Sequence, residues 1–301
     1  VSGNNTQGIS LDTANSNTIS GNFIGTDING TADIGNTSNG VYVLNSTLAT
    51  IGGDSASERN IISGNNNDGV QISGIDSYNN TVSGNYIGTD VNGTTDLGNS
   101  NDGIDVQSSA HDNDIGGTTS EYRNIISGNK QYGVNLYQSG SQNTVQGNYI
   151  GTDVNGTADL GNSNTGIAFA QSSSNTIGGV DGVTLGGTCT GSCNVISGNG
   201  VDGIGIYTDS DSNVVEGNFV GVNVSGTASL GNSGNGVQIS TPSASTIIGG
   251  TPTGARNVLS GNASSGVIAI NAGTDNNVIK GNYIGTDTTG MLDLGNTTFG
   301  V

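Results

Sequence analysis

The stretch NTVSGNYIGTDVNGTTDLGN, residues 80–99, decides the fold, because close copies of it return along the whole chain. Its inner phrase GN(F/Y)(I/V)G begins at five nearly evenly spaced glycines: Gly21, Gly84, Gly147, Gly217 and Gly281. Self-similarity at a nearly fixed period indicates a repeat architecture in which neighbouring units bury a shared core.

A shorter period lies within these units. One aliphatic position recurs regularly, with a single longer interval before Ile196, at Val1, Ile19, Val41, Ile62, Val82, Ile104, Ile126, Val145, Ile167, Ile196, Val215, Val237, Leu259, Ile279 and Val301. We therefore expect about 14 coils of ~21 residues, three to each larger unit. Strands stacked ~4.8 Å apart would make a rod about 67 Å long.

Short strands end in Gly-Asn throughout the chain. Residues 134–136, Val-Asn-Leu, alternate between apolar and polar, which points one set of side chains inward, while Gly and Asn supply the positive-φ corners. No stretch has helical periodicity. The sequence predicts an all-β, single-stranded, right-handed parallel β-helix (solenoid) continuous over residues 1–301, with the hand set by the crossover preference.

Asparagine stands at a fixed offset, two positions before the aliphatic residue, in nine coils. These residues are Asn17, Asn60, Asn80, Asn124, Asn143, Asn194, Asn213, Asn257 and Asn277. A fixed offset predicts hydrogen-bonded asparagine ladders along the axis.

Two phrases carry a family resemblance: N-x-(I/V)-x-G-N alternates with G-(V/I)-x-(I/V/L). This pattern resembles the right-handed parallel β-helix repeat of pectate-lyase-like proteins, and the GNYIGTDxNGTxDLGN units resemble those of large secreted repeat proteins of bacteria and archaea. The resemblance implies the fold. It does not fix a function, because this fold carries enzymes, adhesins and inert stalks alike.

The charge balance limits the partners. Twenty-four acidic and five basic residues give a net charge of -19, which leaves no basic surface for nucleic acid or an anionic membrane. No apolar run is long enough to span a bilayer, so we expect no membrane insertion. Surface glycans and cations remain open as partners.

Catalytic candidates are few. By resemblance, enzymes of this fold need clustered aspartates, or calcium with a basic residue. Arg59, Arg123 and Arg256 occupy one repeat slot, which favours a corner role. The single histidine, His111, precedes Asp112 but has no third group to orient it. We expect no catalytic residue and no enzyme activity.

The recurring loop GTDxNGTxDLGN is the best candidate for a metal site. Oxygen ligands at alternate positions around a glycine resemble the first half of an EF-hand loop, without the closing glutamate. Its calcium candidates are Asp27, Asn29, Asp33, Asp90, Asn92, Asp96, Asp153, Asn155 and Asp159. The alternative is that Asp27 and its equivalents cap an Asx-type turn. In the fourth copy Asn223 and Ser229 replace the two aspartates. No other cofactor is expected.

Cys189 and Cys193 are the only cysteines, and both lie in an inserted loop at residues 181–194. Without other soft ligands nearby, they favour a small disulfide, and hence an extracellular or cell-surface location. Two free thiols are the alternative.

These features favour a non-enzymatic extracellular structural protein, such as a surface stalk, an adhesin shaft or a fibre subunit. Neither Val1 nor Val301 resembles a cap, so we expect end-to-end self-association or further coils of the same chain. The alternative is a carbohydrate-binding or polysaccharide-degrading module, whose sugar-stacking rings would be Tyr42, Tyr86, Tyr137, Tyr149, Tyr207 and Tyr283.

Overall fold

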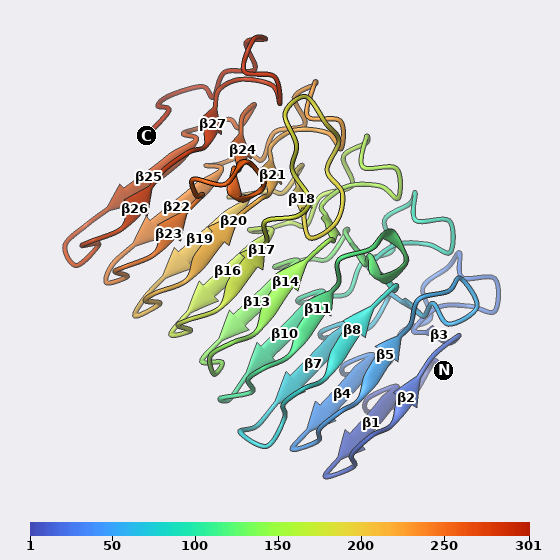
Figure 1. The fold of residues 1–301 in the computed structure, drawn as a ribbon. Helices are drawn as coiled ribbons and strands as arrows, with labels where there is room; N and C mark the ends of the chain where they lie inside the picture. The colour runs from blue at the N-terminus through green and yellow to red at the C-terminus, as the bar shows by residue number, and fades with distance from the viewer.

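The computed structural model describes residues 1–301 and contains three parallel sheets of nine strands each (Figure 1). Sheet A consists of β1 (Ile9–Asp12), β4 (Val41–Leu44), β7 (Val70–Ser73), β10 (Ile104–Gln107), β13 (Val134–Tyr137), β16 (Ile167–Ala170), β19 (Ile204–Tyr207), β22 (Val237–Ser240) and β25 (Val267–Ile270). Sheet B consists of β2 (Thr18–Ile19), β5 (Thr50–Gly52), β8 (Thr81–Ser83), β11 (Asp114–Gly116), β14 (Thr144–Gln146), β17 (Thr176–Gly178), β20 (Val214–Glu216), β23 (Ile247–Ile248) and β26 (Val278–Ile279). Sheet C consists of β3 (Phe23–Ile24), β6 (Ile61–Ile62), β9 (Tyr86–Ile87), β12 (Ile125–Ile126), β15 (Tyr149–Ile150), β18 (Val195–Ile196), β21 (Phe219–Val220), β24 (Val258–Leu259) and β27 (Tyr283–Ile284). Two short 3₁₀ turns lie at Ser120–Tyr122 and Thr253–Ala255.

Each coil contributes one strand to each sheet, which confirms the parallel β-helix. The predicted coil length is wrong, however. The recurring aliphatic residues lie on every second strand along the chain, whereas one full coil contains three strands. Ile62, Val82 and Ile104 therefore lie in three different sheets and are not vertical neighbours.

The register gives the true coil. Ile104 pairs with Val70 in the coil before it and with Val134 in the coil after it. These pairings make a coil roughly 32 residues long, within the range of solenoid repeats. Nine coils replace the predicted 14, and two coils, not three, make the larger unit. Eight intervals of ~4.8 Å give a stack about 38 Å long instead of about 67 Å.

Aliphatic side chains fill the inside of every coil. One cluster of 32 buried residues extends from Ile19 to Val267. A second cluster of 11 buried residues lies on the outer face of sheet C, so consecutive residues such as Ile61 and Ile62 are both buried. A strand that is buried on both faces does not alternate between apolar and polar residues. This is why the NIISGN phrases, which contain strands of sheet C, carry two consecutive isoleucines.

Two asparagine ladders are complete. The B–C ladder, at the corner between sheets B and C, contains Asn22, Asn60, Asn85, Asn124, Asn148, Asn194, Asn218, Asn257 and Asn282. The C–A ladder, between sheets C and A, contains Asn4, Asn36, Asn65, Asn99, Asn129, Asn162, Asn199, Asn232, Asn262 and Asn296. In both, the Nδ2 of each asparagine donates to the Oδ1 of the next.

The predicted ladder is thus confirmed, but its membership was mixed. Asn60, Asn124, Asn194 and Asn257 belong to the B–C ladder. The other five predicted residues belong to a third, interrupted column, the A–B column, which reads Asn17, Ala49, Asn80, Asn113, Asn143, Asn175, Asn213, Thr246 and Asn277.

The residue just before the A–B column adopts a positive φ in all nine coils: Ser16, Leu48, Asn79, Asp112, Gln142, Ser174, Ser212, Ser245 and Asn276. Glycine and asparagine were expected at such corners, yet no glycine and only two asparagines occur here. Stacking of equivalent corners overrides the local preference of the single residue.

Leu48 is the most costly member of this corner column, since a bulky side chain disfavours its φ of 57°. We expect Leu48→Asn to raise the free energy of unfolding by about 0.5–1 kcal/mol, because asparagine tolerates the left-handed region and Leu48 is 57% exposed. Urea unfolding measures the change. A lower midpoint would show that Leu48 contributes packing that outweighs the backbone cost.

Candidate functional site

The five recurring loops form hairpins along one side of the solenoid, next to sheet C (Figure 1). An antiparallel bridge closes each of them: Thr26 with Asp33, Thr89 with Asp96, Thr152 with Asp159, Val222 with Ser229 and Thr286 with Asp293. Residues Val91, Val154 and Val224 of these hairpins pack on the second hydrophobic cluster. The hairpins therefore cover the outer face of sheet C.

Successive hairpins also stack on one another. The N–H of Val91 donates to the carbonyl of Gly30 over 2.8 Å, and equivalent bonds join Val154 to Gly93, Val224 to Gly156 and Thr288 to Gly226. A Cβ at Gly93 would lie 2.9 Å from the Cβ of Val154, so glycine is required at this approach. The loops form a continuous ladder outside the three sheets.

An aspartate side chain closes four of the five hairpin turns. Asp90 Oδ1 accepts the N–H groups of Thr94 (2.9 Å) and Thr95 (3.0 Å), and its Oδ2 accepts the Asn92 amide (2.9 Å). Asp27 and Asp153 make the same contacts. In the fourth copy the amide oxygen of Asn223 replaces the carboxylate.

The predicted calcium ligands accordingly have structural partners. Hydrogen bonds from the Thr31 and Ala32 N–H groups hold the pKa of Asp27 below its usual value. Asp33 lies on the opposite strand, where burial raises its pKa, and Asp96 pairs with Lys130 over 3.1 Å. No three acidic, histidine or cysteine side chains converge as a metal site would need. Calcium binding stays a prediction of the sequence.

The turn-cap role of Asp90 predicts different outcomes for two substitutions. Asp90→Asn retains an acceptor oxygen, as Asn223 does, and should change the free energy of unfolding by less than ~0.5 kcal/mol, whereas Asp90→Ala should cost about 1–2 kcal/mol. Urea unfolding with and without calcium chloride provides the measurement. A calcium-dependent rise in the midpoint that Asp90→Asn abolishes would favour the metal site instead.

The repeated arginines have a packing role. The guanidinium groups of Arg59, Arg123 and Arg256 lie 4.2, 4.1 and 4.0 Å from the ring centres of Tyr86, Tyr149 and Tyr283. The Nε of each arginine donates to the carbonyl of Gly84, Gly147 or Gly281. These three tyrosine rings are therefore covered by cations and do not offer a free face to sugars.

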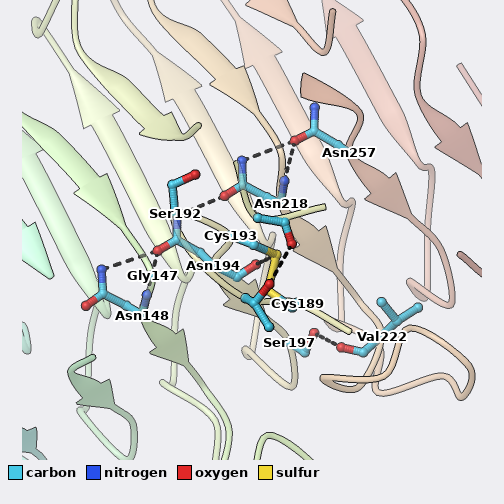
Figure 2. Close-up of a disulfide and its surroundings, with 12 residues drawn as sticks. Gly147, Asn148, Cys189, Ser192, Cys193, Asn194, Ser197, Asn218, Val222 and Asn257 are labelled. Atoms are coloured by element: carbon cyan, nitrogen blue, oxygen red, sulfur yellow. Dashed lines mark hydrogen bonds between the residues drawn. A yellow bond between two sulfur atoms is a disulfide. The ribbon is translucent and has the colours of Figure 1, made fainter. Parts of the chain in front are cut away.

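The fourth unit replaces this arginine–tyrosine pair with a disulfide. Cys193 occupies the arginine slot, Phe219 occupies the tyrosine slot, and the predicted Cys189–Cys193 disulfide is present. Both cysteines are buried in the cluster that contains Phe219. In Figure 2 the bond lies beside the B–C ladder, next to Asn194 and Asn218.

The predicted insertion lies in the connection between β17 and β18, and it contacts two hairpins. The N–H of Cys189 donates to the carbonyl of Val224 (2.8 Å), and the N–H of Gly186 donates to that of Thr288 (3.0 Å). The insertion thus joins the fourth hairpin, which lacks both aspartates, to the fifth.

Reduction of the disulfide should release this insertion. The short ring predicts a loss of about 2 kcal/mol, located at the insertion rather than spread over the coils. Hydrogen exchange of the Cys189 and Gly186 amides, with and without reductant, measures it. A variant with both cysteines changed to alanine should not respond to reductant; unchanged exchange in the parent protein would refute the prediction.

The structure brings His111 and Asp112 together at the corner between sheets A and B. The Nδ1 of His111 lies 2.5 Å from Asp112 Oδ2, and the histidine ring stacks on Tyr78. Asp114 turns away and accepts the Thr144 hydroxyl. Tyr78 was absent from the sugar-stacking candidates, although it stands two positions before Asn80, as His111 does before Asn113.

A carboxylate cluster on sheet A was missed in the sequence. Asp68, Asp102 and Asp105 are only 1%, 3% and 6% exposed. Gln71 Nε2 donates to Asp68 Oδ2 and Asp105 Oδ2, both over 3.0 Å, and Asn135 donates to Asp102 Oδ2. All these side-chain partners are neutral, and Asp105 Oδ1 has no partner.

Burial and mutual repulsion raise the pKa values of this cluster. Burial, followed by the charge of Asp68, raises the pKa of Asp102 to about 7 and that of Asp105 to about 8. Burial also raises the pKa of Asp68. The cluster therefore holds protons near neutral pH. The phrase DG(V/I) at residues 68 and 102 is the sequence signal, visible only once coils of the true length are aligned.

Comparisons with known proteins return no matching family model, no similar curated protein and no similar solved structure. No helix of the structure has the length and apolar character needed to cross a membrane.

Proposed function

We propose that this chain is a non-enzymatic, extracellular structural segment: a stiff shaft within a surface stalk, adhesin or fibre. The observation that carries the proposal is the pair of unbroken asparagine ladders. They run from Asn22 to Asn282 and from Asn4 to Asn296 and pass through every coil. Bending or opening the rod would leave buried amide groups unpaired, which is costly.

The hairpin ladder and the charge add to this support. The stacked hairpins join units two coils apart, so stiffness does not depend on the three sheets alone. The net charge of -19 favours separate, soluble rods over side-by-side aggregation. The formed Cys189–Cys193 disulfide is compatible with secretion and supports the extracellular part of the proposal.

The two ladders have one direction along the rod. Because every ladder amide donates toward the higher-numbered coil, further coils fit only head to tail, whether they belong to the same chain or to a second copy. Concentration-dependent lengthening of rods would support association of copies.

Polysaccharide cleavage is the competing function, and the burial of the acidic cluster weighs against it. A substrate must touch the acid and base that act on it, whereas Asp68, Asp102 and Asp105 lie beneath the surface.

Electron microscopy and polysaccharide incubation together test the proposal. We expect straight rods of uniform width, and no new reducing ends or unsaturated products from neutral or uronic-acid polysaccharides. Cleavage by the parent protein that Asp102→Asn abolishes would overturn the structural assignment. Flexible particles without a constant rod shape would overturn it as well.

A further inference from the structure

The corner between sheets A and B breaks the repeat in one place. The column two positions before the A–B column reads Asn15, Thr47, Tyr78, His111, Ser141, Ser173, Asp211, Ala244 and Asp275. Its only two aromatic rings stand in adjacent coils, where a parallel bridge joins Tyr78 to His111. Elsewhere the column is small or polar, so this pair is a local departure from the stacking pattern.

The two rings form a stacked, half-exposed pair. Their centres are 5.2 Å apart and their planes differ by 11°. Tyr78 is 38% exposed and the His111 side chain 33%. Asp112 holds the histidine ring through Nδ1, and a Cβ at Gly140 would lie 2.6 Å from the Cβ of His111. Asp112 therefore orients the histidine ring against which Tyr78 stacks.

A hollow adjoins each ring. The hollow beside Tyr78, of about 380 Å³, is also lined by Asn15, Thr47 and Asp76. The hollow beside His111, of about 420 Å³, is also lined by Ser109, Asp112 and Gln142. Because each ring lines a different hollow, the stacked pair forms the wall between them. Both hollows have the size of small-ligand sites.

We propose that the hollows on either side of the Tyr78–His111 pair bind neutral sugars, with one pyranose ring against the outer face of each aromatic ring. The apolar face of a sugar packs on an aromatic ring, while its hydroxyl groups need hydrogen-bond partners at the edge. The carboxylates of Asp76 and Asp112 and the amides of Asn15 and Gln142 supply those partners.

The charge selects against acidic sugars. Each hollow contains one carboxylate, Asp76 or Asp112, and neither contains a lysine or arginine. Together with the net charge of -19, this repels uronic acids. The site thus differs from the buried aspartate cluster in both location and chemistry. It also adds a function to the structural role, because a shaft that binds neutral glycans along its side can attach to a glycan surface.

Titration with methyl β-glucoside and cellobiose, followed by amide chemical shifts, tests the site. We expect weak binding with shift changes at residues 75–78, 109–112 and 141–142, and no binding of galacturonic acid. Tyr78→Ala should weaken binding of both sugars about tenfold, the loss expected for one aromatic contact. Tyr78→Leu keeps the apolar bulk and should also weaken it, which separates loss of the ring face from a folding defect.

Tyr122→Ala provides the matched control, because Tyr122 is a 37% exposed tyrosine that lines neither hollow. It should leave the affinity unchanged. Absence of shift changes with both sugars would overturn the proposal. So would shifts located elsewhere, or an affinity that Tyr78→Leu and His111→Gln leave intact.

Discussion

Asn124→Ala is expected to lower the free energy of unfolding by about 3–5 kcal/mol, the largest effect of any single side chain discussed. Asn124 Oδ1 accepts the backbone N–H of Asn85 (3.0 Å), and its Nδ2 donates to the carbonyl of Val82 (2.8 Å). Alanine leaves both backbone groups buried without partners and opens a small cavity. Urea unfolding at neutral pH measures the loss.

Asn17→Ala is the matched control for this ladder substitution. Asn17 occupies the first position of the interrupted A–B column, is exposed, and its amide donates only to Asn15 within the same turn. Its replacement should cost less than ~0.5 kcal/mol. If Asn124→Ala cost no more than Asn17→Ala, the ladders would be a by-product of the corners and would not stabilise the solenoid.

The carboxylate cluster predicts an unusual pH dependence. Burial raises the folded-state pKa of Asp105 to about 8 and that of Asp102 to about 7, whereas an unfolded aspartate titrates near ~3.9. The folded state therefore binds more protons across this range, so stability is fully present in acid and falls as the pH rises to about 8. We expect the protein to be about 2–4 kcal/mol less stable at pH 9 than at pH 5.

Asp105→Asn isolates the contribution of one carboxyl group. At pH 3 Asp105 is protonated in both the folded and the unfolded state, so the variant and parent should have similar stability; at pH 9 the variant should be more stable and its pH profile flatter. Asp12→Asn, which changes an exposed carboxylate on the first coil, should leave the profile unchanged. Equal slopes for the parent and Asp105→Asn would exclude a charged, buried Asp105.

The all-β class, the parallel stacking, the ladder and the disulfide were predictable, because each depends on residues that repeat or pair locally. The alternation of apolar and polar residues at Val134-Asn135-Leu136 predicts the strand β13, and the aliphatic residues of GIDVQ predict β10. The coil length was not predictable in the same way. NTVSGNYIG reads as one phrase, yet the chain turns at Gly84 and Asn85 from β8 into β9, and a new sheet begins there.

Alternating connections explain why the false period looked regular. Between sheets B and C, the short connection 84–85 alternates with the longer connection 53–60, and between sheets C and A, the connection 88–103 alternates with 63–69. The recurring aliphatic position lies on every second strand, so each interval contains two connections, and their unequal lengths add up to a nearly constant sum.

The Asp68, Asp102 and Asp105 cluster was missed for the same reason, since it spans two coils of the true length. The right-handed sense of the winding stays a prediction from the crossover preference.

Pairwise cysteine cross-linking tests the three-strand coil most directly, in a background with Cys189→Ser and Cys193→Ser. Thr144 and Thr176 are register partners on β14 and β17, so cysteines at these two positions should form an intramolecular disulfide on mild oxidation. The shorter coil expected from the sequence would instead place Gln146 beside Ala168, which belong to different sheets in this structure. Coils of three strands predict efficient cross-linking of the first pair and none of the second; cross-linking of the second pair alone would refute the three-strand coil.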